Sequence, residues 1–321
     1  MSTTSKWLGS VDGDARKRTL LGIGSFLLPL LVWCLVSYVP FVWHPKVHVI
    51  DPGGVDYFQV DMLVDKTMFT DEVTNMEREH LAVPTGKSAN PIYLPAPDQV
   101  AKAFYNGFVN PPKSKDVPSM PASLWHSIQI IFWGFLISSI VGVPLGILSG
   151  TYTLMGRLSE PFIEFFRYLP APAFGALAVA ILGIYDGPKI AIIVIGTLFQ
   201  QVLIIANTTR KLEVTLIEAA RTLGTRNIKL LSKVVVPGIL PDLYRDQRIL
   251  LGWAWTYLIV AELIGTSSGI TWFITQQARY QHFDNVYAAI MTIGIIGFGT
   301  DLILARLGRR LFPWDRTQDR R

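Results

Sequence analysis

The sequence is poor in cysteine and in charged residues. Its 321 residues include a single cysteine, Cys34, so the chain can form no internal disulfide and cysteine usage says nothing about the redox compartment. Charged residues make up 17% of the chain, whereas a soluble globular domain carries about 25%. Hydrophobic residues make up 50%, and the mean hydropathy is +0.36. This composition is typical of a chain that lies largely in a membrane.

Motifs for catalysis, phosphate binding and metal binding are also missing. No Ser-His-Asp or paired-carboxylate arrangement stands out, so we expect no catalytic residue and no enzyme activity in this chain. Gly-Lys-Ser at 86–88 matches only the end of a phosphate-binding loop, because Leu81 stands where the first glycine is required. His44 and His48 have no obvious third ligand, and we expect no metal site.

Six apolar stretches are each long enough to cross ~30 Å of hydrocarbon as a helix. Two of them carry charge: the third contains Glu164 and Arg167, and the fifth contains Glu262. Because only helices and closed barrels satisfy their own backbone in lipid, we expect an all-α membrane protein, a polytopic bundle of about six transmembrane helices. The stretches are Leu20–Val42, Leu124–Ser149, Pro161–Ile184, Pro188–Ala206, Ile249–Gly265 and Val286–Ala305.

The positions of Lys and Arg predict that both termini are cytoplasmic. Of the 29 basic residues, four precede the first span, eight lie between 210 and 248, and six follow from Arg306 onward. The first span lacks a small-x-small cleavage site and is longer than a signal peptide's apolar region, so we expect an uncleaved anchor. The pI of about 9.2 is then explained by membrane orientation and requires no nucleic acid.

This topology divides the chain into segments. Residues 1–19 form a cytoplasmic N-terminal segment, 43–123 lie outside, 124–306 form the core with a cytoplasmic loop at 207–248, and 307–321 form a basic tail. In the outer segment we expect irregular structure, with a short strand at Tyr57–Val64, a short helix with an acidic first turn at Thr70–Leu81, and an amphipathic interfacial helix at 98–108.

The cytoplasmic loop contains a short charged helix, expected at 213–226. Its helix formers at 218–220 are followed by Gly224, which suits a helix end where glycine takes the left-handed conformation. We expect Pro237 and Pro241 to bar an uninterrupted helix into the next span. Local physics alone equally allows an ordinary amphipathic interfacial helix that stops at a glycine.

The spacing in this loop resembles the cytoplasmic signature of ABC importer permeases. Glu218, Ala219 and Ala220 are followed after three residues by Gly224, and after nine more by a valine run ending at Pro237. Valines stand for the isoleucine and leucine of the signature. Further segments are similar to the nitrate/sulfonate/taurine/bicarbonate subfamily of type I permeases, namely 90–97, 134–135, 142–146, 167–172, 218–224 and 255–262. Two departures are an insertion at about 44–89 and Gln200-Gln201 in place of Phe-Pro.

The resemblance implies a function for the whole chain. Two permease copies would surround a path for a small solute, an oxyanion such as nitrate, bicarbonate or a sulfonate, in a bacterial inner membrane. A soluble binding protein would deliver the solute, and two ATPase subunits, which bind the ATP and magnesium, would each grip the 213–226 helix. Glu218 would orient that helix, Ala219 and Ala220 would allow close docking, and Gly224 would permit the turn. This chain itself would hold no cofactor.

Polar residues inside the spans are candidates for the translocation path, because charge in the bilayer is costly and usually faces the bundle interior. They are Arg167, Gln200, Gln201 and Glu262, and each has a structural alternative. Arg167 could reach the inner surface or pair with a nearby glutamate, the glutamines could join helices, and Glu262 could form a structural pair. Two other functions stay open: a secondary transporter or channel with Glu262 and Asp301 as ion relays, and a membrane-anchored receptor.

Overall fold

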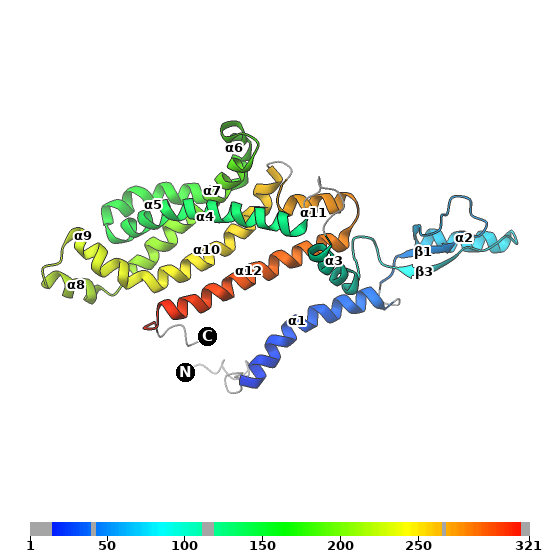
Figure 1. Cartoon of the computed structure of the whole chain (residues 1–321), viewed down its shortest axis with the longest axis horizontal. Coiled ribbons are helices and arrows are strands. Elements are labelled where there is room, and N and C mark those ends of the chain that lie inside the picture. Colours follow the sequence, from blue (N-terminus) through cyan, green and yellow to red (C-terminus); the bar gives the residue numbers. More distant parts are fainter. Residues whose placement is uncertain (1–14, 40–42, 111–118, 265–267, 316–321) are drawn as a thin grey trace, which may run out of the picture. The chain divides into compact units, whose positions relative to one another are not determined.

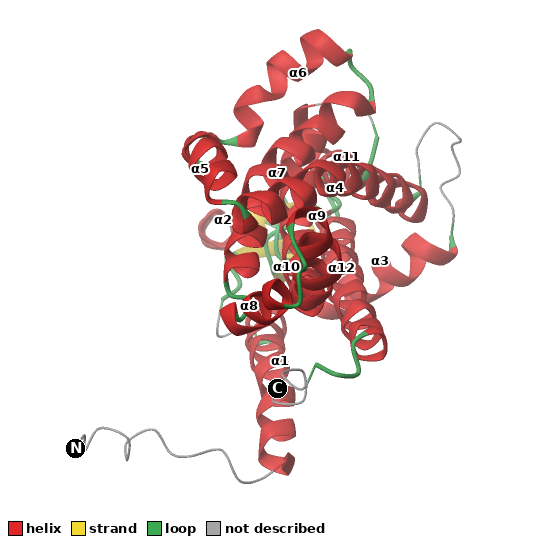
Figure 2. Cartoon of the chain, turned by 90° about the vertical axis from the view of Figure 1, so that its left-hand side faces the viewer, coloured by secondary structure: helices red, strands yellow, loops and turns green. Residues whose placement is uncertain are grey.

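The computed structural model describes residues 15–39, 43–110, 119–264 and 268–315. Within these ranges the chain is mostly helical, and its strands form one small sheet (Figure 2). Residues 1–14 of the predicted N-terminal segment, 40–42 at the end of the first predicted span, Gly265 of the fifth and 316–321 of the basic tail lie outside the described residues. The predicted fold class is confirmed for the part of the chain described.

The chain divides into two compact units. The first comprises Met1–Asn106 and Gln277–Ala288, and the second comprises Gly107–Gln276 and Ala289–Arg321. Helices α3 (Pro97–Val109), α11 (Ile270–Arg279) and α12 (Phe283–Leu311) each continue from one unit into the other.

The first unit contains a three-stranded antiparallel sheet in the order β2-β1-β3. The strands are β1 (Lys46–Asp51), β2 (Leu63–Asp65) and β3 (Thr85–Ala89), and α2 (Lys66–Arg78) follows β2 directly (Figure 1). The prediction of an irregular insertion at 44–89 is therefore corrected: the segment folds as a small sheet with one helix. The strand expected at 57–64 is present only at its last two residues, as part of β2.

Alternation along β1 explains why this sheet forms. Val47 and Val49 are buried on one face, while the residues between them are only partly buried. Val49 packs against Val55, Phe58 and Val64, with Phe69 and Met76 of α2 beside them. The helix α2 begins before its predicted start, so no acidic residue lies in its first turn, and that prediction was wrong.

Two further helices of the first unit match the sequence predictions. In α1 (Ala15–Tyr38), residues Leu20–Tyr38 are apolar enough to span a membrane, as predicted for the first span. The predicted interfacial helix at 98–108 is confirmed as a helix by α3. Val100 and Ala103 on its buried face pack with Ala288, and Trp33 of α1 lies against the same cluster.

The second unit is built on long helices. α4 (Met120–Thr151), α7 (Asp186–Arg210) and α10 (Val236–Ile264) pack against one another, and α12 carries the last predicted span. Among the described residues, four helices are long and apolar enough to cross a membrane, α1, α4, α7 and α12, and a bent pair makes a fifth. α10 has 29 residues, which at ~1.5 Å per residue is long enough to span, but it is more polar.

The bent pair occupies the third predicted span. α5 (Thr153–Arg167) and the segment from Ala171 to Leu182, which includes α6 (Gly175–Leu182), meet at an angle of 86°. Pro170 precedes the break and Pro172 lies just beyond it. Proline lacks a backbone N–H and clashes with a continuing helix, so the expected disturbance of this span is found as a sharp bend.

Helices α4 and α7 of the second unit are joined along a row of small residues. Gly134, Gly142, Gly146 and Gly150 follow at intervals of four or eight, with Ser138 between the first two, so all lie on one face of α4. A Cβ at Gly134, Gly146 or Gly150 would lie 2.5–2.8 Å from Ile193, Ile205 or Thr209 of α7. Small residues let membrane helices approach this closely, where dispersion contacts hold them together.

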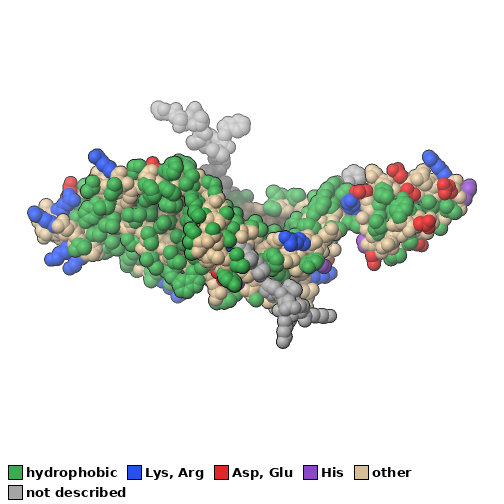
Figure 3. Space-filling view, turned by 90° about the horizontal axis from the view of Figure 1, so that it is seen from above, with side chains coloured by type: hydrophobic (Ala, Val, Ile, Leu, Met, Phe, Trp, Pro, Cys, Tyr) green, Lys and Arg blue, Asp and Glu red, His purple; other side chains and the backbone are tan. Residues whose placement is uncertain are grey.

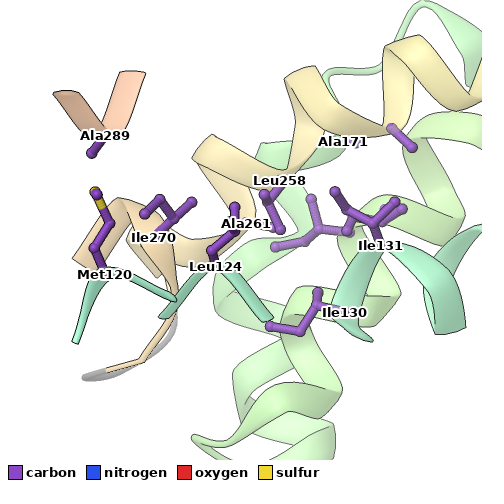
Figure 4. Close-up of a cluster of buried hydrophobic side chains, with 12 residues drawn as sticks. Met120, Leu124, Ile130, Ile131, Ala171, Leu258, Ala261, Ile270 and Ala289 are labelled. Carbon is purple, nitrogen blue, oxygen red and sulfur yellow. The ribbon is translucent and has the colours of Figure 1, made fainter. Parts of the chain in front are cut away.

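The main apolar core of the second unit lies where α4, α7, α10 and α11 meet. Twelve buried residues contribute, and Figure 4 shows several of them converging from different helices. Ile192, Ile193, Leu258 and Ala261 are fully buried. This core holds α4, α7, α10 and α11 together and so positions the polar residues that these helices carry.

Candidate coupling helix and translocation path

The expected cytoplasmic helix is present as α8 (Val214–Thr222). It ends in a Schellman motif: Thr225 N–H donates to Ala220 C=O (3.0 Å) and Gly224 N–H donates to Arg221 C=O (3.0 Å). Gly224 has φ +84°, the left-handed conformation predicted from the sequence, and the space where a Cβ would lie is open. The glycine therefore ends the helix without steric cost and redirects the chain.

The surface of α8 is open, because none of its residues is buried. Glu218 and Ala219 are exposed and Ala220 is partly exposed. Apolar side chains are exposed beside them: Leu223 is 86% and Ile228 76% exposed, and Val214 and Leu216 are also exposed. Lys and Arg side chains gather at the end of the second unit that carries α8 and α9 (Asn227–Leu230) (Figure 3). Such a combination of apolar and basic side chains is typical of a protein-binding surface.

The chain on either side of α8 is anchored in the bundle. Leu212, just before α8, packs with Ile205 of α7 and Ile239 of α10, in a buried cluster that also includes Leu243. A Cβ at Gly238 of α10 would lie 2.8 Å from Leu212. A force applied to α8 would therefore reach two long helices of the second unit through a well-packed contact.

Pro237 does not interrupt the helix, which corrects the sequence prediction. Helical backbone runs from Asn227 through a π-helical turn at Leu231–Val235 into α10, where Pro237 lies in the first turn and Pro241 within the helix. In the π turn Val236 N–H donates to Leu231 C=O, five residues back. The wider turn accommodates the missing proline donor, a compensation that π-turns allow.

Two of the predicted path residues lie in one small pocket. Arg167 and Gln200 line it with aromatic side chains from α5, α7 and α10, namely Phe166, Phe199, Trp253 and Tyr257. Arg167 is exposed, and its guanidinium donates to the Tyr168 hydroxyl (3.0 Å) and lies 4.9 Å from that ring's centre. The glutamate partners considered for Arg167 are not used: Glu160 pairs with Arg210 instead.

The second glutamine of the pair has a different environment. Gln201 is fully buried and forms hydrogen bonds from α7 to two other helices. Its Oε1 accepts from Ser138 of α4 (2.7 Å), and its Nε2 donates to Ser139 (2.9 Å) and to Gln247 Oε1 of α10 (2.7 Å). The structure thus separates the pair: Gln200 lines the pocket with Arg167, and Gln201 joins helices.

Glu262 is 3% exposed and its carboxylate is occupied by internal donors. Oε1 accepts from Ser127 Oγ (2.5 Å) and Oε2 accepts from Thr271 N–H (2.8 Å), while Ile270 N–H donates to the same serine oxygen (2.8 Å). The carboxylate lies against the first turn of α11, where exposed N–H groups favour negative charge. Gly269, with φ +100°, leaves room for it. Glu262 therefore joins α4, α10 and α11.

Asp301, the other acid considered as an ion relay, is also paired. Arg248 of α10 donates from Nε to Oδ1 (3.1 Å) and from Nη2 to Oδ2 (2.9 Å) of this carboxylate. This bidentate geometry is the strong form of an arginine–carboxylate pair. Glu262 and Asp301 therefore both have protein partners. A gradient-driven carrier would need these two carboxylates as free ion relays, whereas in this structure they join helices.

Sequence reasoning missed a buried lysine. Lys189, the second residue of the fourth predicted span, lies in the first turn of α7 and is fully buried. Its Nζ donates to Asp186 Oδ1 (3.1 Å) and to Ser268 Oγ (2.6 Å), and His126 lies 3.0 Å from the same carboxylate. The sequence could have indicated this ion pair, because Asp186 and Lys189 are one helical turn apart. Its long-range partners could not be read from the sequence.

Comparison with known proteins agrees with this architecture. Residues 142–313, which include α7, α8 and α10, match the family described as "Binding-protein-dependent transport system inner membrane component". The taurine transport system permease TauC of Escherichia coli is 30% identical over 236 residues, 72% of this chain and 84% of that protein. The bicarbonate transport system permease CmpB of Synechococcus elongatus is 27% identical over 57% of this chain and 66% of its own length.

Solved structures give the same fold. A structure of the MetNI methionine ABC transporter covers 58% of this chain and 93% of the matched chain, with a TM-score of 0.53 and 19% identity. The family match spans more than half of the 321 residues, and the resemblance drawn from the cytoplasmic signature is confirmed. This chain belongs to the family of inner membrane components of binding-protein-dependent transport systems.

Proposed function

We propose that this chain is the membrane-spanning permease subunit of an ATP-driven importer and that α8 is its contact with the ATPase. The observation that carries the proposal is the exposure of α8. Its small and apolar side chains lie open on a helix whose flanking residues pack into α7 and α10. Family membership supports the same assignment.

In this mechanism the ATPase subunits bind ATP and magnesium, and the permease supplies no catalytic group. Ala219 and Ala220 allow close docking, Glu218 orients the helix, and Gly224 lets the chain turn away at its end. Closure of the ATPases moves α8, and the packing of Leu212 against Ile205 and Ile239 transmits the movement to the spans. The bundle then changes which side of the membrane its path faces.

The assembly we infer has two permease copies, two ATPase subunits and an extracytoplasmic solute-binding protein. Both termini and α8 face the cytoplasm of a bacterial cell, as the distribution of basic residues indicates. The transported solute is a small oxyanion, such as a sulfonate, bicarbonate or nitrate. The similarity to permeases of taurine and bicarbonate transport systems supports this class, as does the position of Arg167 beside Gln200 in one pocket.

A carrier driven by an ion gradient is the second candidate, and it is disfavoured. Its relays would be Glu262 and Asp301, and both carboxylates already accept internal hydrogen bonds. Co-purification separates the two functions, because a permease brings down an ATPase chain and a self-sufficient carrier does not.

The test of the coupling contact is the substitution Ala219→Trp, made in the complete transporter. We expect normal membrane insertion, loss of solute uptake and loss of stimulation of ATP hydrolysis by the loaded binding protein, because an indole on the docking face keeps the ATPase away. Ala101→Trp is the matched control, since Ala101 is an exposed helical alanine of α3. Normal uptake by the Ala219 variant would refute the proposed contact.

A further inference from the structure

A cavity of about 770 Å³ lies within the first unit. One wall is the face of the sheet opposite its apolar core, with His48, Ile50 and Lys87, and the other is formed by the end of α1 and the chain around Asn90. Cavities of roughly 300–1,000 Å³ are the usual size for small-molecule sites. This cavity is separate from the pocket that holds Arg167 and Gln200.

Two side chains at one corner of the cavity converge on a single backbone oxygen. The carbonyl of Ser37 accepts from Asn90 Nδ2 at 3.0 Å and lies 3.3 Å from His44 Nε2. Ser37 is 5% exposed and His44 8% exposed. The remaining atoms of these side chains, Ser37 Oγ, His44 Nδ1 and Asn90 Oδ1, have no hydrogen-bond partner among the described residues.

The shared carbonyl determines what these atoms can accept. A carbonyl oxygen only accepts hydrogen bonds, so Nδ2 of Asn90 and a protonated Nε2 of His44 must face it. In the neutral imidazole, Nδ1 is then an acceptor, like Oδ1 of Asn90, and the Ser37 hydroxyl can also accept. Buried polar atoms are normally paired. A ligand that completes this corner must therefore donate several hydrogen bonds, as an ammonium group does.

The sheet face of the cavity carries a cation, Lys87. Lys87 of β3 lies directly across from His48 of β1 in the strand register. His48 lies 3.7 Å from Asp61, whereas Lys87 has no ion-pair partner among the described residues. Asp284 is the other acid that lines the cavity. An acidic group of a ligand could therefore form an ion pair with Lys87, because no carboxylate of the described residues does so.

We propose that this cavity binds a small zwitterion, with its ammonium group at Ser37, His44 and Asn90 and its acidic group at Lys87. His44 and Lys87 of this site belong to the inserted segment at about 44–89, and the cavity shares no lining residue with the pocket of Arg167 and Gln200, so the site is distinct from the candidate path. The proposal does not depend on the proposed import function, because binding is measured on the isolated chain.

The first experiment titrates the purified full-length chain in detergent by calorimetry with four probes. Taurine and β-alanine carry both groups, ethanesulfonate lacks the amine, and ethylamine lacks the acid. We expect saturable binding of the two zwitterions and at least about tenfold weaker binding of each truncated probe, since each loses charge-assisted hydrogen bonds. A cavity that holds only water would show no saturable binding of either zwitterion, which would overturn the proposal.

The second experiment places the ligand in the cavity. Ser37→Ala removes a hydroxyl that has no partner in the structure, so we expect unchanged or higher folding stability and about three- to tenfold weaker binding of taurine. Ser25→Ala is the control in the same helix, because Ser25 donates to the Gly22 carbonyl and does not line the cavity. Lys87→Ala should weaken taurine binding and leave ethylamine unaffected, and Lys66→Ala should change neither.

Two outcomes of these variants would contradict the proposal. Taurine affinity unchanged in both Ser37→Ala and Lys87→Ala would place the ligand elsewhere. Loss of binding in Arg167→Ala with retention in both cavity variants would assign it to the translocation pocket, and would leave the proposed import function untouched.

Discussion

The contact of α4 with α7 makes a sharp prediction for the substitution Gly146→Ala. A Cβ at this position would lie 2.8 Å from Ile205 Cβ and 2.9 Å from the Val202 carbonyl oxygen. Ordinary carbon–carbon contacts are about 3.5–4.0 Å. Neither obstacle is the mobile end of a side chain, so the two helices must separate locally to admit the methyl group.

The size of the effect follows from two opposing terms. Overpacking a well-packed site costs about 1–3 kcal/mol, and replacing glycine by alanine inside a helix returns up to about 1 kcal/mol. We therefore expect the free energy of unfolding to fall by about 1–2 kcal/mol. Gly252→Ala is the matched control, because Gly252 is also helical and, apart from the adjoining backbone of its own helix, no described atom lies within 4 Å of the position that its new methyl group would take. It should be neutral or slightly stabilising.

The assay is unfolding of the purified chain in mixed micelles by titration with denaturing detergent, followed by tryptophan fluorescence. Both variants are measured beside the unchanged protein at the same micelle composition. Equal unfolding free energies for Gly146→Ala and Gly252→Ala would refute the close approach of α4 and α7.

Three further predictions concern the polar residues and the end of α8. Gln201→Leu removes three interhelical hydrogen bonds and should lower the unfolding free energy by about 2 kcal/mol, whereas Gln200→Leu should change it by less than about 0.5 kcal/mol; equal effects would contradict the separation of the pair. Glu262→Gln leaves one acceptor for two donors, including Thr271 N–H, and should cost about 1–3 kcal/mol in the same titration; no loss would show that the carboxylate is not structural. Gly224→Ala forces a side chain into the left-handed region at a cost of about 1–2 kcal/mol, so uptake should fall at unchanged protein level, and unimpaired uptake would argue against the fixed helix end.

Local features of this chain could be read from the sequence where neighbouring residues decide them. Gly224 was expected in the left-handed conformation because it follows strong helix formers, and it has it. The apolar stretches in α1, α4, α7 and α12 mark helices because composition alone decides what dissolves in lipid. The row of glycines on α4 was also readable as small residues at four-residue intervals, a signal typical of close helix packing.

Features that depend on distant residues could not be derived in the same way. β3 has no apolar alternation and exists because β1 offers it a pairing edge, although Val47 and Val49 were a signal for β1 itself. Proline in a helix is expected to interrupt it, but the π turn before Pro237 lets the helix continue into α10. All four candidate path residues are polar residues inside apolar spans, and nothing else in the sequence distinguishes them. Only their long-range partners show that Gln201 and Glu262 join helices, whereas Gln200 and Arg167 line a pocket.

The central claim is that α8 is the surface on which an ATPase subunit docks. The most direct measurement places a photo-reactive amino acid at position 219 and, as a control, at position 101, in cells that produce the whole transporter. The account predicts a crosslink from position 219 to the ATPase chain and none from position 101. The absence of any crosslink from position 219 to the ATPase chain, at a normal level of the assembled transporter, would contradict it.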